Sequence, residues 1–198
     1  ELSKILLESG GEIRPVLKAM FNSDWFKAST SFKKVKSPTE LIAGVLKQTG
    51  EYSSPVPGIQ QFAITSLNGS LVEGPLAIMG QRLMNPPTVE GWHTGHEWIN
   101  SGTLSERVGF VERQFRDISK PGVQDMVERA GSLDDDPDKL VDRCLDLLGG
   151  IVVSEQTYDS LVAYAKELSS LDSSDEETSV GVHDLLQMTA STVDYQFE

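Results

Sequence analysis

The chain has 198 residues, of which 38% are hydrophobic and 24% charged, a composition typical of a folded globular protein and not of a disordered one. Its 17 basic and 30 acidic residues give a formal net charge of −13, which argues against nucleic acid and against an anionic membrane surface as partners. The single cysteine, Cys144, excludes an internal disulfide, and no apolar run is long enough for a membrane span. The chain starts within an apolar pattern and without a methionine, so we expect a fragment or a processed product.

Apolar residues at helical spacing predict a helix over residues 13–21, after a short apolar segment over residues 2–7. A small cluster of Lys33, Lys34 and Lys36 follows, which is typical of a solvated surface. The next helix has a clear start, because Ser37 and Glu40 fit a capping box around Pro38. We expect this helix to end at Gly50.

One long irregular loop is predicted from about Glu51 to Ser101, in which residues 59–71 are ambiguous and residues 75–83 form a short helix. After the loop, Thr103 and Glu106 fit a second capping box. An amphipathic helix is expected to follow and to stop at Pro121 and Gly122, with this apolar stripe facing the core: Leu104, Val108, Val111, Phe115 and Ile118.

Three further helices are predicted in the last third of the chain. Asp136 is the expected N-cap of one, which places Cys144 on its apolar face as a buried structural thiol, and Ser154 is the expected N-cap of the next. Residues 169–179 are rich in acid and serine and are interpreted as an acidic linker before the last helix. The pattern as a whole predicts one all-α domain over residues 1–198 with seven or eight helices.

The densest run of unusual residue types is NPPTVEGWHTGHEW, residues 85–98. Its adjacent prolines and two glycines favour an extended, turning loop. We interpret Trp92 and Trp98 as candidate binding residues, because aromatic side chains dominate interface energetics. The alternative is that both indoles are buried and only hold the loop against the helices. Trp25 is a third candidate anchor.

Four polar side chains in this run suggest a second kind of site: Glu90, His93, His96 and Glu97. Histidine and carboxylate together suit a metal such as zinc, but two histidines three residues apart on a loop are a weak signal. We therefore predict no metal and no cofactor, and we interpret the histidines as exposed loop residues. An enzyme would need all four side chains to meet in one pocket.

Three phrases of the chain resemble the bacterial family named domain of unknown function 1800. MFNSDWF with KVKSPTELIAGVL is similar to its "S-x-x-F…K-x-K-S-P-x-E-L", and residues 185–197 are similar to its closing "L-x-L-x-x-x-S-x-E-Y-Q". The phrase "G-x-x-L-F-x-P-P-N-V-x-G-W-P-G-G-x-x-W-I-N-x-x-T-L-x-x-R" is matched by Gly80, Leu83, Pro86, Pro87, Val89, Gly91, Trp92, Gly95, Trp98, Ile99, Asn100, Thr103, Leu104 and Arg107.

The chain departs from this phrase at His93 and His96, which argues against a histidine-based activity shared across the family. The resemblance implies the C-terminal portion of a longer, mostly helical member without an established activity, with a helical insert over residues 121–179. It also implies an exported or periplasmic location and a sulfatase-like companion protein encoded nearby.

Three functions follow as hypotheses. The first is a non-catalytic helical module that binds a partner protein or an extracellular polymer through the loop. The second is a hydrolase acting on an extracellular polymer, with the four polar loop residues as its site. The third is a scaffold part of a larger protein whose active site lies elsewhere.

Overall fold

The computed structural model describes residues 1–30, 33–50, 73–170 and 175–197. Within these ranges the chain forms ten α-helices and two short 3-10 helices and no strand, so the predicted all-α class is confirmed. The helices outnumber the seven or eight expected, because two short apolar segments are also helical: Leu2–Glu8 (α1) and Asp24–Thr30 (α3). The division into one domain with an insert stays a prediction.

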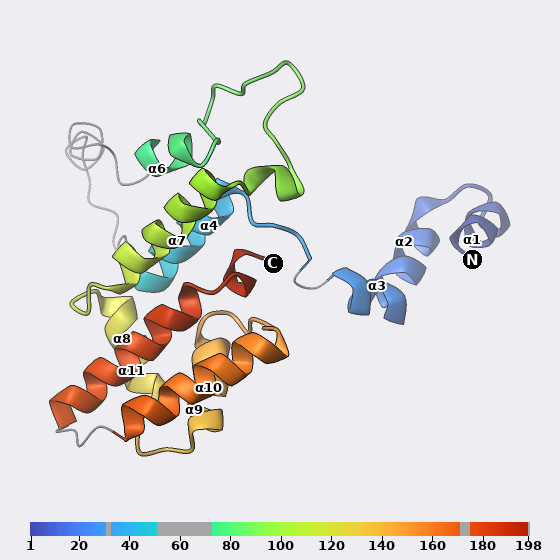
Figure 1. The fold of residues 1–198 in the computed structure, drawn as a ribbon. Coiled ribbons are helices and arrows are strands. Elements are labelled where there is room, and N and C mark those ends of the chain that lie inside the picture. Colours follow the sequence, from blue (N-terminus) through green and yellow to red (C-terminus); the bar gives the residue numbers. More distant parts are fainter. Residues whose placement is uncertain (31–32, 51–72, 171–174, 198) are drawn as a thin grey trace.

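Six helices form the main body of the molecule (Figure 1): α4 (Pro38–Thr49), α7 (Ser101–Phe115), α8 (Pro121–Ala130), α9 (Pro137–Leu147), α10 (Glu155–Ser169) and α11 (Asp175–Ala190). Helix α7 packs between α4 and α11, and α9 packs against α8, α10 and α11. Their apolar faces meet in one core cluster, whose largest side chains include Phe110, Phe115 and Leu140.

The N-terminal helices stand apart from this body (Figure 1). Helix α1, α2 (Ile13–Asn22) and α3 pack on one another, and neither α1 nor α2 has a buried residue. Helix α6 (Glu73–Ile78) lies on the body instead, against α4 and α7, where Leu76 is buried.

The predicted helix starts at Ser37, Asp136 and Ser154 are confirmed. Each side chain accepts a hydrogen bond from a backbone amide of the first turn, which satisfies a donor that has no partner inside the helix. Cys144 of α9 is fully buried, and this burial raises the pKa of its thiol to about 12. The interpretation as a buried structural thiol is therefore confirmed.

The carboxyl group of Glu40 makes the stability of the start of α4 depend on pH. Burial raises the pKa of its carboxyl, but hydrogen bonds from Lys34 and from Ser37 outweigh burial and lower the pKa to about 2. The stability that these bonds supply is complete above the ordinary pKa of 4.5 and is lost as the pH falls towards about 2. Because the Glu40 side chain is 40% exposed, we expect these bonds to contribute less than about 1 kcal/mol to the free energy of unfolding.

The variant Glu40→Gln measures this contribution. Urea unfolding at neutral pH is expected to show a small loss of stability relative to the parent protein, and the difference between the two proteins is expected to vanish near pH 2. A difference that is independent of pH would contradict the assignment to the Glu40 carboxylate.

Helix α7 differs from the prediction at both ends. Its N-cap is Asn100, three residues before the predicted N-cap at Thr103, and Thr103 takes the N3 position of the capping box. It ends at Phe115 and not at Pro121, which instead starts α8. Ile118 consequently lies beyond the helix and is 42% exposed, so its predicted place in the core stripe is wrong.

The described part of the predicted irregular region, residues 73–101, also differs from the prediction. Helix α6 ends at Ile78, five residues before the predicted end, and Gly80 follows in the left-handed region with φ +93°. A short 3-10 helix, Gly95–Trp98 (η1), interrupts the loop near its end. The ambiguous residues 59–71 lie outside the described part of the chain.

The acidic linker predicted over residues 169–179 is partly helical. Helix α10 continues to Ser169, and α11 already starts at Asp175. A low apolar content shows that a segment is exposed and not that it is irregular. The packing of Val182, Leu185 and Leu186 stabilises α11.

Candidate functional site

The central loop of the chain, residues 81–100, is called the signature loop below. It leaves the body after α6, extends outwards and returns to the N-terminus of α7 (Figure 1). A tight turn closes near its middle, where Thr88 and Gly91 form an isolated β-bridge and the Thr88 hydroxyl donates to the Gly91 carbonyl over 3.1 Å.

Trp98 anchors the returning end of the signature loop. Its side chain is 5% exposed and lies beside Gly80, at the end of the preceding helix. The Thr103 hydroxyl donates to the Trp98 carbonyl over 2.8 Å, which joins the loop to the first turn of α7. Trp98 therefore holds the loop and does not offer its ring at the surface.

Trp92 joins the two sides of the loop. Its ring is half-buried, and its indole N–H donates to the Arg82 carbonyl over 3.0 Å. Because this bond spans ten residues, it closes the outer part of the loop into a ring of chain. Trp25, the third tryptophan, lies far from the loop on α3 and is 55% exposed.

The four polar candidates of the loop are exposed: Glu90, His93, His96 and Glu97. Glu97 accepts a hydrogen bond from the Thr94 amide over 3.2 Å in a capping box, and its carboxylate lies 3.7 Å from His93 Nδ1. The ring of His96 faces Phe197 instead, at 6.3 Å between centroids. In the described ranges, no group of three His, Cys, Asp or Glu side chains is placed to hold a metal ion.

The outgoing half of the loop exposes several apolar side chains among the polar residues Asn85 and Thr88. Leu83 is 47% exposed, Met84 95% exposed, and Val89 completely exposed, with the exposed Pro86 and Pro87 between them. We call these five residues the loop tip. Met84 has φ +61° and is, among the described residues, the one non-glycine in the left-handed region. An L-residue with a side chain is strained there by about 1–2 kcal/mol.

A buried hydrogen-bond network lies beneath the base of the loop. Arg107 of α7 is completely buried; its Nε donates to Gln196 Oε1 over 2.8 Å, and its Nη2 donates to the Lys36 carbonyl over 2.6 Å. Burial lowers the pKa of its guanidinium to about 10. Two neighbouring donors, Arg107 Nη1 and Gln196 Nε2, are buried without a hydrogen-bond partner in the described structure.

Lys36 and Tyr195 complete this network. The Lys36 ammonium donates to the Tyr195 carbonyl over 2.7 Å and lies 4.2 Å from the centre of the Tyr195 ring, a cation–π geometry. The Tyr195 hydroxyl donates to Gln48 Oε1, and burial raises the pKa of this hydroxyl far above its usual range. We call Lys36, Arg107, Tyr195 and Gln196 the motif junction.

The comparison with protein families decides the identity of the chain. The model of the family described as "Protein of unknown function (DUF1800)" matches residues 1–197. The chain belongs to this family. No curated protein and no solved structure matches it significantly. In the described residues, no helix is both long and apolar enough to cross a membrane.

The motif junction joins the three phrases of this DUF1800 chain. Arg107 comes from the central phrase, Lys36 from the first and Gln196 from the last, and they meet at hydrogen-bond distance. The backbone joins the same segments, since the Lys36 amide donates to the Gln196 carbonyl over 2.9 Å and Val35 bridges to Phe197. The sequence alone does not predict this contact, because the three phrases are far apart along the chain.

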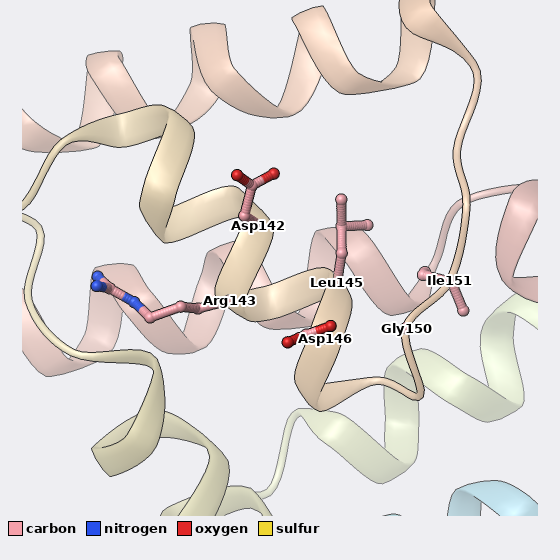
Figure 2. Close-up of a pocket in the computed structure, with 6 residues that line it drawn as sticks. All are labelled: Asp142, Arg143, Leu145, Asp146, Gly150 and Ile151. Carbon is pink, nitrogen blue, oxygen red and sulfur yellow. The ribbon is translucent and has the colours of Figure 1, made fainter.

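The DUF1800 chain also has a surface pocket that the sequence analysis did not predict (Figure 2). It has a volume of about 340 Å³ and is lined by Asp142, Arg143, Leu145, Asp146, Gly150 and Ile151. Two of its polar side chains have partners, since Arg143 Nη2 donates to Asp135 over 2.5 Å and Asp142 accepts from Tyr158 over 3.0 Å, while Arg143 Nε is buried without a hydrogen-bond partner in the described structure. Burial and the neighbouring Asp142 raise the pKa of Tyr158 to about 12.

Proposed function

We propose that this chain is a non-catalytic binding module of a larger exported bacterial protein, and that its loop tip is the contact surface. The observation that carries the proposal is the contrast within one loop. Its base is fixed by a buried tryptophan and by the motif junction, while its outgoing half exposes the large apolar side chains of Leu83, Met84 and Val89 among polar neighbours. A rigid support with exposed large apolar side chains is the form of a protein-binding hot spot.

The strain at Met84 supports the same proposal. Glycine or asparagine adopts a positive φ at lower cost, and the Met84 side chain has almost no contacts of its own because it is 95% exposed. A strained and exposed apolar residue stabilises nothing in the chain itself. Such residues concentrate at functional sites, where the strain is compensated by another contact.

The proposed partner is the sulfatase-like companion protein that the family resemblance implies. That resemblance alone supports both the partner and the export of the chain. Bound to the tip, the partner would cover side chains that the isolated chain leaves in water, including Met84 and Val89.

Isothermal titration of the purified companion tests this proposal. We predict that the double variant Met84→Asp/Val89→Asp weakens binding at least about tenfold, because two charges then replace apolar contacts. Folding is not expected to change, since both side chains are exposed. The matched control is Val152→Asp/Val180→Asp, which adds two charges at side chains that are 64% and 48% exposed and lie outside the signature loop.

Two results would contradict the proposal. The first is a parent protein that does not bind the companion. The second is an equal loss of affinity in the loop variant and in the Val152/Val180 control, which would mean that added negative charge, and not the loop tip, governs binding.

The hydrolase alternative is not proposed. Among the four polar candidates in the described structure, only His93 and Glu97 approach each other, and Glu97 is already engaged as a helix cap. No specific observation at these residues favours a reaction over a loop that binds.

A further inference from the structure

Helix α2 has an apolar stripe that the described chain covers only in part. Ile13 is 65% exposed, Leu17 42% and Phe21 52%, and these residues follow one another at four-residue spacing along one side of the helix. Phe21 also contacts Phe26 of α3 edge-to-face, at 5.2 Å between centroids, so the stripe sits on a small packed unit. Exposed large apolar side chains in a row mark an interaction surface.

Two basic residues lie along one edge of this stripe. Arg14 and Lys18 are exposed and four residues apart, so their charges are separated by one helical turn, about 6 Å. Neither forms an ion pair within the described residues, and α2 contains no acidic residue. The stripe therefore requires a partner surface that is partly apolar and acidic at its edge.

Such a surface exists on the body of the same protein. A shallow hollow of about 490 Å³ lies on the outward side of α10 and is lined by Glu155, Gln156, Asp159, Ser160 and Ala163. Glu155 and Asp159 also stand one turn apart, and neither forms an ion pair in the described chain. The small side chains of Ser160 and Ala163 leave room for larger side chains to enter.

We propose that α2 of one copy docks in the α10 hollow of a second copy, so that two chains exchange their N-terminal helices reciprocally. Arg14 and Lys18 then pair with Glu155 and Asp159, whose one-turn spacing they match. Leu17 and Phe21 enter the hollow beside Ala163. The exchange generates a two-fold dimer in which each contact occurs twice, so a modest contact is doubled.

The choice of a second copy rests on charge. The basic edge of the stripe meets an acidic hollow, while the chain as a whole has a net charge of −13, which disfavours an anionic lipid surface as the occupant. The contact is separate from the loop tip, so it does not depend on the proposed function.

Sedimentation equilibrium of the full 198-residue chain tests the dimer. The expected result is a mass of twice 21.7 kDa that falls towards the monomer as protein is diluted or salt is raised. A monomer at every concentration would overturn the proposal and would assign the stripe to another occupant.

Charge reversal identifies the surfaces. The variants Arg14→Glu/Lys18→Glu and Glu155→Lys/Asp159→Lys are each expected to weaken dimerisation at least about tenfold. When the two variants are mixed, both exchanged contacts regain opposite charges, so a heterodimer is expected at close to the parent affinity. The matched control reverses the exposed one-turn pair Asp125 and Arg129 of α8, which is not expected to change dimerisation. Mixed variants that stay monomeric would overturn the pairing.

Discussion

Replacing Trp98 with alanine is expected to lower the free energy of unfolding by about 3–5 kcal/mol, the range for large aromatic side chains removed from a core. The indole is 5% exposed, so its contacts are almost entirely internal. Its removal leaves a cavity between the end of α6 and the start of α7, beside Gly80 and beneath the His93 ring. Urea unfolding measures the loss.

The same variant is expected to release the signature loop. Arg82 is an exposed trypsin site in that loop, and its carbonyl is held by the Trp92 indole. Once the anchor at Trp98 is lost, cleavage after Arg82 is expected to be faster at denaturant concentrations where the body is still folded.

Trp25→Ala is the control for this prediction. That indole is 55% exposed, so its removal is expected to change the stability by no more than about 0.5 kcal/mol. If the two tryptophan variants were equally destabilised, Trp98 would not be the anchor that its burial indicates.

Replacing Arg107 with alanine is the second large prediction, with an expected loss of about 2–4 kcal/mol. The change leaves the Lys36 carbonyl and the Gln196 side chain without the donors that now satisfy them. It also separates α7 from two segments that lie 71 and 89 residues away along the chain. Urea unfolding of the variant measures the loss.

Arg107→Met distinguishes hydrogen bonding from volume. A methionine fills part of the space, and it removes a buried charge that is expensive to desolvate. The loss of stability in Arg107→Met is therefore expected to be about half the loss in Arg107→Ala. Equal losses in the two variants would show that the hydrogen bonds dominate. A loss below about 1 kcal/mol in both would contradict the role of the motif junction.

The helices of this chain could be predicted where a local signal decides them. Ser37, Asp136 and Ser154 each start a helix as expected, because an N-cap acts on amides two or three residues away. The predicted start of α7 was wrong. Asn100 and Thr103 are both residues that favour the N-cap position, and the sequence pattern alone does not show which of the two caps the helix.

The candidate site could be predicted only in part. The run of proline, glycine and tryptophan residues is enough to locate the signature loop in the sequence. The burial of Trp98 and the exposure of Met84 depend on which side of the loop faces the body, and the sequence does not show this. The motif junction was missed for a related reason. Lys36, Arg107 and Gln196 are far apart in the chain, and no periodicity reports a contact between them. The one available signal was that each lies in a phrase of the same family.

Hydrogen–deuterium exchange of the full chain, measured with and without the sulfatase-like companion, tests the central claim most directly. The account predicts slower exchange on binding in residues 81–91, around the loop tip, while α7 and the motif junction are already protected in the free chain. A companion that binds and leaves the exchange of residues 81–91 unchanged would contradict the claim that this loop is the contact surface.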